Sequence, residues 1–359
     1  MRIAQVSPLY ESVPPRHYGG TERVVSYLTE ELVSCGHRVT LFASGDSVTN
    51  AQLVPVCKRS LRLDGGVRDY LAYHYLVLEQ VFKRRDQFDI IHFHIDYLHY
   101  PLSRRFRVPQ VTTLHGRLDL PELAELYAEF TDMPVVSISA AQRQPLPMAR
   151  WATTVHHGLP LDRYRYQEGS GGYLAFLGRI SPEKGLTDAI EIARRIGKPL
   201  RVAAKIDDAD RSFFDTSIAP LLESSHVEFI GEIGEREKDR FLGEAEALLT
   251  PVCWPEPFGL VVIEALACGT PVIGYRRGAL PEIIDHGQTG FLVQNVDEAV
   301  EAAGCVSRIS RRACRDSFER RFTSARMASD YLKVYEELLR TPIETAAVLA
   351  AGESFGRNG

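Results

Sequence analysis

The sequence lacks the features that mark secreted, disulfide-stapled and membrane-spanning proteins. Its six cysteines are scattered and form no CxxC pair, which predicts reduced thiols in a cytoplasmic protein. No run of about 18 uninterrupted apolar residues occurs, so no membrane-spanning helix is expected. The chain opens with MRIAQVSPLY, without a basic flank, an apolar segment and a cleavage site, so no secretory leader is expected.

An excess of positive charge is also missing. The net charge is −5, which argues against a general nucleic-acid binder. Small basic clusters at 83–85 and 104–107 are interpreted as solvated faces, with a peripheral membrane contact as the weaker alternative. The GxGxxG pattern is absent from the first glycine-rich loop, so a dinucleotide-binding first domain has little support.

The chain alternates short apolar runs with amphipathic helices, and 359 residues suit two domains. Near-continuous apolar strands separated by helices are typical of parallel sheets covered on both faces. The strands are predicted within 3–9, 37–44, 88–94, 108–116 and 134–142, and again within 172–180, 200–206, 227–233, 247–253, 270–275 and 289–293. The polar, glycine-rich stretch at 167–172 marks the seam, and the fold class is α/β with two doubly wound domains. In such folds the ligand binds in the cleft at the carboxyl ends of the strands.

Two loops at those strand ends have the composition of an anion site. Gly19 and Gly20 lead into a helix, where glycine lets backbone amides approach a phosphate closely. Arg179 and Lys184 flank a helix-start signal after the first strand of the second half, which suits a diphosphate. From spacing alone, a flexible loop and two surface cations explain these residues equally well.

A pair of glutamates stands in the stretch WPEPFGLVVIEALACG. Pro257 favours an extended Glu256 in the loop, so its carboxylate is expected to point into the cleft and accept hydrogen bonds from hydroxyls. The helix should begin near Gly259, with the amides of 258–260 at its positive end. Glu264 lies one to two turns into the helix and either lines the cleft or sits on a solvated edge.

Histidines and aspartates complete the set of candidates. His115 follows a buried strand and should stand at the cleft. His92, His94 and Asp96 have the residue types of metal ligands, but a hydrogen-bonded structural histidine, or a cleft-lining His94, is favoured over a metal site. The acidic stretch 207–210 has no partner histidine and is interpreted as solvated.

Three motifs in order, FLGRISPEKG, EPFGLVVIEALACGTPVIG and GALPEIIDHGQTGFLV, resemble glycosyltransferase family 4, and the resemblance covers nearly the whole chain. It implies the GT-B fold, two Rossmann-like domains facing each other across a cleft. The N-terminal acceptor domain would span 1–160 and the nucleotide-sugar donor domain 161–324. A helix at about 325–345 would rejoin the first domain, before a loosely ordered tail at 341–359.

The resemblance also implies roles for the candidate residues. Arg179 and Lys184 would hold the donor diphosphate and stabilise the leaving nucleotide, and His115 would lie beside the transferred sugar, perhaps at its 6-hydroxyl. Glu256 would bind the sugar hydroxyls and Glu264 those of the ribose. The remaining donor contacts would come from Gly19, Gly20, Phe258, Gly259, Leu260, Gly231 and Ile233.

The activity implied is transfer of a hexose, glucose favoured, from a UDP-sugar with retention of configuration and without a metal or other cofactor. Alternatives are a GDP-mannose-dependent mannosyltransferase, a nucleotide-sugar epimerase or a non-catalytic sugar-nucleotide binder. The acceptor, whether small molecule, glycan or lipid-linked, stays open, as do the linkage and the oligomeric state. The sequence departs from the family at the domain junction, where His157 stands in the usual place of an asparagine.

Overall fold

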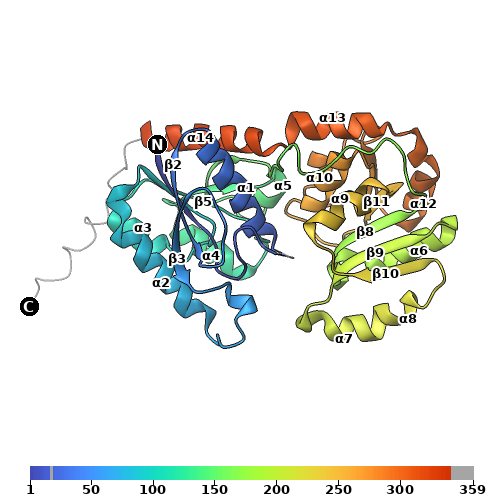
Figure 1. Ribbon diagram of the computed structural model, residues 1–359, viewed down its shortest axis with the longest axis horizontal. Coiled ribbons are helices and arrows are strands. Elements are labelled where there is room, and N and C mark those ends of the chain that lie inside the picture. Colours follow the sequence, from blue (N-terminus) through green and yellow to red (C-terminus); the bar gives the residue numbers. More distant parts are fainter. Residues whose placement is uncertain (17–18, 341–359) are drawn as a thin grey trace, which may run out of the picture.

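The computed structural model describes residues 1–16 and 19–340, which form two α/β domains joined side by side (Figure 1). Each domain contains one wholly parallel sheet, with strand order β3-β2-β1-β4-β5-β6-β7 in the first and β10-β9-β8-β11-β12-β13 in the second. The tail predicted at 341–359 lies outside the described residues. The GT-B architecture expected from the sequence is therefore present.

The first domain carries seven strands and five helices within the described ranges. Its strands are β1 (Arg2–Val6), β2 (Arg38–Ser44), β3 (Gln52–Cys57), β4 (Ile90–Phe93), β5 (Gln110–Thr113), β6 (Pro134–Ser137) and β7 (Arg150–Thr154). Its helices are α1 (Gly20–Ser34), α2 (Tyr70–Lys83), α3 (Tyr100–Phe106), α4 (Pro121–Glu129) and α5 (Ala140–Arg143).

The second domain repeats this plan. Its strands are β8 (Leu174–Arg179), β9 (Leu200–Lys205), β10 (Val227–Gly231), β11 (Ala247–Thr250), β12 (Val272–Tyr275) and β13 (Gly290–Val293). Its helices are α6 (Leu186–Ile196), α7 (Arg211–Phe213), α8 (Ala219–Leu222), α9 (Glu235–Gly243), α10 (Leu260–Cys268), α11 (Leu280–Ile283), α12 (Val296–Cys305) and α13 (Arg311–Arg321). The last helix, α14 (Ser324–Arg340), leaves this domain.

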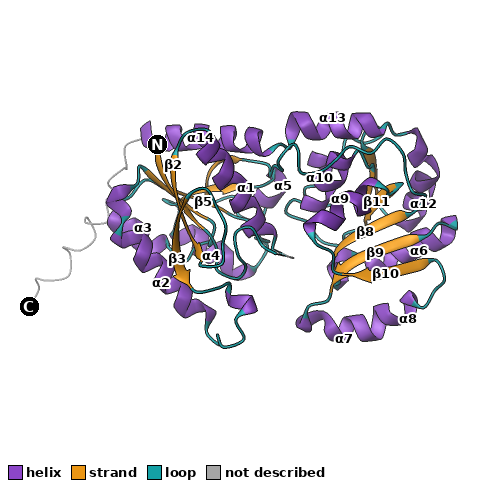
Figure 2. Cartoon of the chain, in the orientation of Figure 1, coloured by secondary structure: helices purple, strands orange, loops and turns teal. Residues whose placement is uncertain are grey.

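Helices lie on both faces of each sheet (Figure 2), which explains why the central strands are buried on both sides. Every residue of β4, β5, β6, β11 and β12 is buried. The sequence did not predict β3 and β7, which are the two edge strands of the first sheet and are mostly exposed or half-buried. An edge strand buries less apolar surface, so its sequence carries a weaker pattern.

Helix α14 crosses from the second domain and packs on the first. Its buried Met327, Tyr331 and Tyr335 join the cluster that contains Ile3 of β1 and Leu28 of α1. The chain thus passes between the domains twice, as the long red helices along one edge of the molecule indicate (Figure 1).

The two crossing segments touch each other. Leu159 donates its amide to the Phe322 carbonyl over 2.9 Å, and Ser324 donates back to the Leu159 carbonyl over 2.8 Å. Gly158 makes this approach feasible, because a Cβ there would lie 2.2 Å from the carbonyl oxygen of Thr323. The two domains are therefore joined by two chain segments that are hydrogen-bonded to each other, rather than by a single linker.

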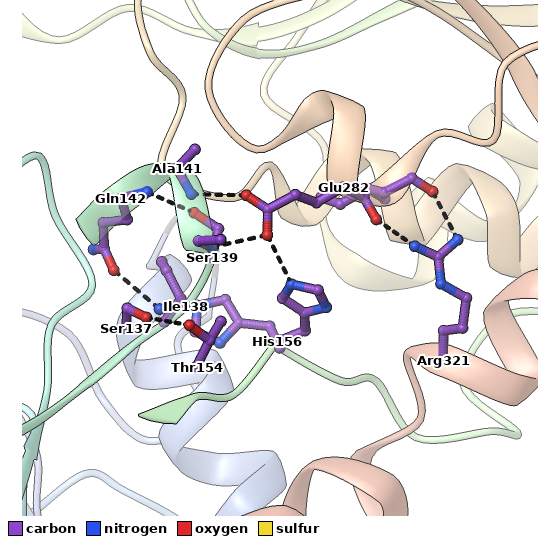
Figure 3. A network of polar contacts seen from close by, with 12 residues as sticks. Ser137, Ile138, Ser139, Ala141, Gln142, Thr154, His156, Glu282 and Arg321 are labelled. Carbon is purple, nitrogen blue, oxygen red and sulfur yellow. Dashed lines mark hydrogen bonds and ion pairs between the residues drawn. The ribbon is translucent and has the colours of Figure 1, made fainter. Parts of the chain in front are cut away.

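A second contact between the domains is centred on Glu282 of α11 (Figure 3). Its carboxylate accepts hydrogen bonds from the amides of Ala140 and Ala141, each at 2.8 Å, and lies 3.1 Å from Nε2 of His156. Ser139, beside them, donates its hydroxyl to the Pro257 carbonyl over 2.6 Å. The start of α5 in the first domain is thereby fixed to the loop that precedes α10 in the second.

Arg315 of α13 secures the chain where it enters the second domain. Its side chain is almost wholly buried and donates to the carbonyls of Leu161, Tyr164 and Ala267 at 2.7–2.9 Å, while Glu319 accepts from its Nε. One guanidinium thus ties the linker, α10 and α13 together.

We expect Arg315→Met to lower the free energy of unfolding by about 3 kcal/mol, because three buried carbonyls lose their donor. Arg312→Met is the matched control, since the Arg312 side chain is 60% exposed and pairs with Asp316 on the same helix. That control should change stability by less than about 0.5 kcal/mol. Urea unfolding of both variants measures the difference, and equal losses would contradict a special role for Arg315.

Candidate active site

A cavity of about 580 Å³ lies between the two domains at the carboxyl ends of the strands. Residues from both domains line it, including all the predicted site residues except Gly231. Those lining residues are Gly19, Gly20, His115, Arg179, Lys184, Ile233, Glu256, Phe258, Gly259, Leu260 and Glu264. Gly231 instead forms an irregularity at the end of β10, with φ +76°, and only its neighbours Glu232 and Ile233 reach the cavity.

Arg179 ends β8 and carries its guanidinium into a group of carboxylates. Glu183 accepts from it at 2.9 Å, and oxygens of Asp207 and Asp210 lie 3.8 and 3.7 Å away. The interpretation of 207–210 as a solvated stretch is therefore wrong for Asp207 and Asp210, whose carboxylates face this cation, while Asp208 and Ala209 are exposed as predicted. Asp207 and Asp210 hold the guanidinium at the cavity wall.

Lys184 and Glu256, both in the second domain, form an ion pair at the cavity wall. The Lys184 ammonium donates to Oε2 of Glu256 over 2.5 Å, and the indole nitrogen of Trp254 donates to the same oxygen over 2.9 Å. Both side chains are largely buried, at 22% and 13% exposed. The cation and the carboxylate are thus fixed beside each other, so a ligand that touches one lies within reach of the other.

Helix α10 begins at Leu260, which agrees with the predicted start near Gly259. Gly259 precedes Leu260 with φ +96°, a conformation that glycine adopts without strain, and Phe258 before it is buried. The first amides of a helix have no acceptor within it and carry its positive end. Gly20 of α1 lies against this start, since a Cβ on it would be 3.4 Å from Leu260. Glycine-rich backbone from one domain and a helix N-terminus from the other therefore share one wall.

Glu264 is buried rather than solvated, with only 2% of its surface exposed. It accepts a hydrogen bond from Lys238 of α9 over 3.1 Å, and Lys238 also pairs with Glu235 at 2.9 Å. Arg23 of α1 reaches Glu235 across the domain boundary at 2.8 Å. Burial alone would raise the pKa of Glu235, but Lys238 and Arg23 outweigh it and hold that pKa below its ordinary value.

His115 stands on the first-domain side of the cavity. Its Nε2 lies 2.9 Å from Nδ1 of His94, and its ring stacks on His157 with centroids 5.3 Å apart. Burial lowers the pKa of His115 to about 3, so its ring is neutral at physiological pH. Its Nδ1 is buried without a hydrogen-bond partner among the described residues.

The structure gives no support to a metal centre at His92, His94 and Asp96. Both ring nitrogens of His92 are occupied, one by Tyr335 and the other by Thr113, each at 2.7 Å. Within residues 1–16 and 19–340, no group of three or more histidine, cysteine, aspartate or glutamate side chains is arranged to hold a metal ion. None of the described helices combines the length and apolarity needed to cross a membrane.

The sequence reasoning missed Arg23, Glu235, Lys238 and Trp254, which support the predicted residues. Helix α9 reads EREKDRFLG, a pattern typical of a solvated face. The signal available was the buried position of Glu264 itself, which requires a cation nearby. Sequence alone could not say which of the many cations supplies it.

Comparisons with known proteins agree with this architecture. The family model described as Glycosyl transferases group 1 matches residues 167–310, and that described as Glycosyltransferase Family 4 matches residues 18–176. A glycogen synthase from Mycobacterium tuberculosis is 26% identical, covering 92% of this chain and 91% of its own length.

Two solved structures show the same fold. AviGT4, a glycosyltransferase involved in avilamycin A biosynthesis, has a TM-score of 0.71 and 24% identity, covering 94% of this chain and 98% of its own. HepE from Anabaena, in complex with UDP-glucose, has a TM-score of 0.68 and 17% identity, covering 94% of this chain and 100% of its own.

The two family models together span both domains, from residue 18 to residue 310, and meet at the seam between them. The two parallel sheets, the cavity between them and these matches lead to one conclusion. The chain belongs to glycosyltransferase family 4 and is a glycosyltransferase of the GT-B type.

Proposed function

We propose that the protein transfers a hexose, glucose in preference, from a UDP-linked donor to an acceptor hydroxyl with retention of anomeric configuration. The observation that carries this proposal is the convergence of two cations and a helix start on one cavity wall. Arg179, Lys184 and the first turn of α10 line the same cavity as Glu256 and Glu264. Such a wall suits a diphosphate flanked by two groups rich in hydroxyls.

The donor would lie along the second domain. Arg179 and Lys184 would bind the diphosphate, with the α10 amides adding their partial positive charge. Glu264, held by Lys238, would accept hydrogen bonds from the ribose hydroxyls, and Glu256 would accept them from the sugar. The base would sit near Ile233, which also lines the cavity. The structure of HepE in complex with UDP-glucose supports a UDP-sugar as the first donor to test.

The charges also fit a reaction that needs no metal. When the bond between the anomeric carbon and the phosphate oxygen breaks, negative charge develops on the diphosphate, and fixed cations stabilise it. The acceptor oxygen would bond the anomeric carbon on the same face, and its proton would pass to the departing phosphate oxygen. A side chain with a pKa of about 3, such as His115, is too weak a base to take that proton at neutral pH.

The acceptor would approach from the first domain. Tyr10, Arg62 and Asp96 line that side of the cavity and leave the class of acceptor open. A GDP-mannose donor is the close alternative, because sugar and diphosphate would use the same wall and only the base contacts would differ.

We expect UDP-glucose to raise the melting temperature in a metal-free thermal-shift screen, because a ligand that binds only the folded state stabilises it. GDP-mannose forms the second arm, and glucose 1-phosphate, which lacks the nucleotide, is the control. A larger shift with GDP-mannose would replace the UDP assignment. No shift with any UDP- or GDP-sugar would remove the donor proposal altogether.

Arg179→Ala and Lys184→Ala should each reduce turnover by about 100-fold or more, the usual loss when transition-state charge stabilisation is removed. Arg195→Ala is the control, since Arg195 lies on α6 of the same domain and pairs with Asp297 outside the cavity. Its turnover should match that of the wild type. Unchanged kinetics in Arg179→Ala or Lys184→Ala would take that residue out of the site.

Slow hydrolysis of the donor without acceptor reports the stereochemistry. With UDP-glucose, which carries an α-linkage, we expect the first-formed free glucose to be the α-anomer, because attack on the same face retains configuration. Proton NMR follows the anomeric signal before mutarotation. A β-anomer as the first product would show inversion and contradict the proposed mechanism.

A further inference from the structure

Helix α2, on the lower margin of the first domain in Figure 1, carries a group of apolar side chains on its outward face. Of the fourteen large hydrophobic side chains that are exposed among the described residues, five fall within residues 63–76, and these are 37–66% exposed. The five, which we call the α2 patch, are Leu63, Tyr70, Leu71, Tyr75 and Leu76. Single exposed hydrophobic residues are ordinary on a protein surface, but a group of them marks a contact with another molecule.

The helical spacing gathers the patch on one side of α2. Residues four apart lie one above the other on a helix, so Leu71 and Tyr75 form a row with Leu76 beside it. The opposite side of α2 is buried through His74, Val77, Leu78, Val81 and Phe82. The outward face becomes charged only in the last turns, where Glu79 pairs with Lys83 at 3.0 Å. The first half of α2 is therefore apolar on both sides, a pattern typical of helices surrounded by apolar material.

The α2 patch extends to the cavity between the domains. The ring of Tyr70 meets the ring of Tyr10 edge-on, with centroids 5.8 Å apart, and Tyr10 lines the cavity. The segment that carries Leu63 is held at the same place, because the amide of Arg62 donates to the Tyr10 carbonyl over 3.0 Å. A molecule that covers the patch therefore lies beside the first-domain side of the cavity.

Positive charge accompanies the patch. Residues 58–85 contain seven Lys or Arg and three Asp or Glu, a net charge of +4, whereas the whole chain carries −5. Lys58, Arg59 and Arg68 are exposed and form no ion pair with a described residue. The stretch that contains Lys58 and Arg59 is fixed beside α2, because Leu61 is buried in the cluster beneath that helix. Exposed cations therefore lie near the start of α2.

These charges distinguish between two kinds of occupant. A second copy of the chain would form a symmetric contact, in which the same patch lies on both sides. The two positive segments would then face each other and repel. An anionic lipid surface instead offers hydrocarbon to the leucines, an interfacial layer to the tyrosines and negative headgroups to the cations. The combination of apolar and basic residues favours the lipid surface.

We propose that the first domain docks on an anionic lipid surface through the α2 patch. Leu71, Tyr75 and Leu76 enter the apolar edge of the lipid layer, while the exposed cations near the start of α2 contact the headgroups. The docked molecule then holds the first-domain side of its cavity next to the lipid. This inference does not depend on which nucleotide or sugar the cavity binds.

Co-sedimentation of the full-length protein with vesicles tests the docking. The probes are vesicles of phosphatidylcholine alone and vesicles of phosphatidylcholine mixed equally with phosphatidylglycerol. We expect binding to the mixed vesicles that weakens when salt is raised from about 0.1 M to about 1 M, because the screening length falls from about 10 Å to about 3 Å. Equal binding to both kinds of vesicle would overturn the role of the cations, and binding to neither would overturn the proposal.

Substitutions locate the contact on the surface. Leu71→Ser should weaken binding to the mixed vesicles about 3- to 10-fold, because a half-exposed leucine no longer leaves water on docking. Arg59→Ser combined with Arg68→Ser should weaken it about 10- to 30-fold, since two attractions to anionic headgroups are lost. Leu161→Ser is the matched control, because Leu161 has the same 50% exposure as Leu71 but lies where the chain enters the second domain. Equal losses in Leu71→Ser and Leu161→Ser would contradict docking through α2.

Two further measurements separate docking from its alternatives. Light scattering without vesicles reports the oligomeric state, and a wild-type dimer that Leu71→Ser dissociates would assign the patch to a second copy and overturn the lipid proposal. Leu71 lies outside the cavity lining, so Leu71→Ser should keep the wild-type melting temperature and its increase with UDP-glucose. If UDP-glucose shifts neither protein, the proposed donor is wrong, while vesicle binding still decides the docking.

Discussion

The cavity depends on one constraint: the negative charge of Glu264, buried inside α10, must be paired with a cation. A carboxylate that is 2% exposed requires a cation, and Lys238 supplies it from α9. Lys238 also pairs with Glu235, which in turn attracts Arg23 from the other domain. One buried charge therefore fixes two helices of the second domain and ties α1 of the first domain to them.

Ion pairs also hold the two cations on the second-domain wall of the cavity. Arg179 and Lys184 already face carboxylates, the first near Glu183, Asp207 and Asp210 and the second against Glu256. Partly buried cations of this kind keep their positions without a ligand, so little reorganisation accompanies binding. In the proposed donor complex, a diphosphate would compete with these carboxylates for the two cations, which would limit tight binding of small anions such as phosphate. A ligand that also bonds Glu256 through hydroxyls gains on both sides of the pair.

Much of this arrangement could be predicted from the sequence because it depends on local patterns. Apolar runs identified the central strands, and Gly259 marked the start of α10. The edge strands β3 and β7 were missed because they bury too little surface to need an apolar run. The supporting cations were missed for a different reason. Lys238 and Glu264 are 26 residues apart, and no local pattern records which charges meet after the chain folds.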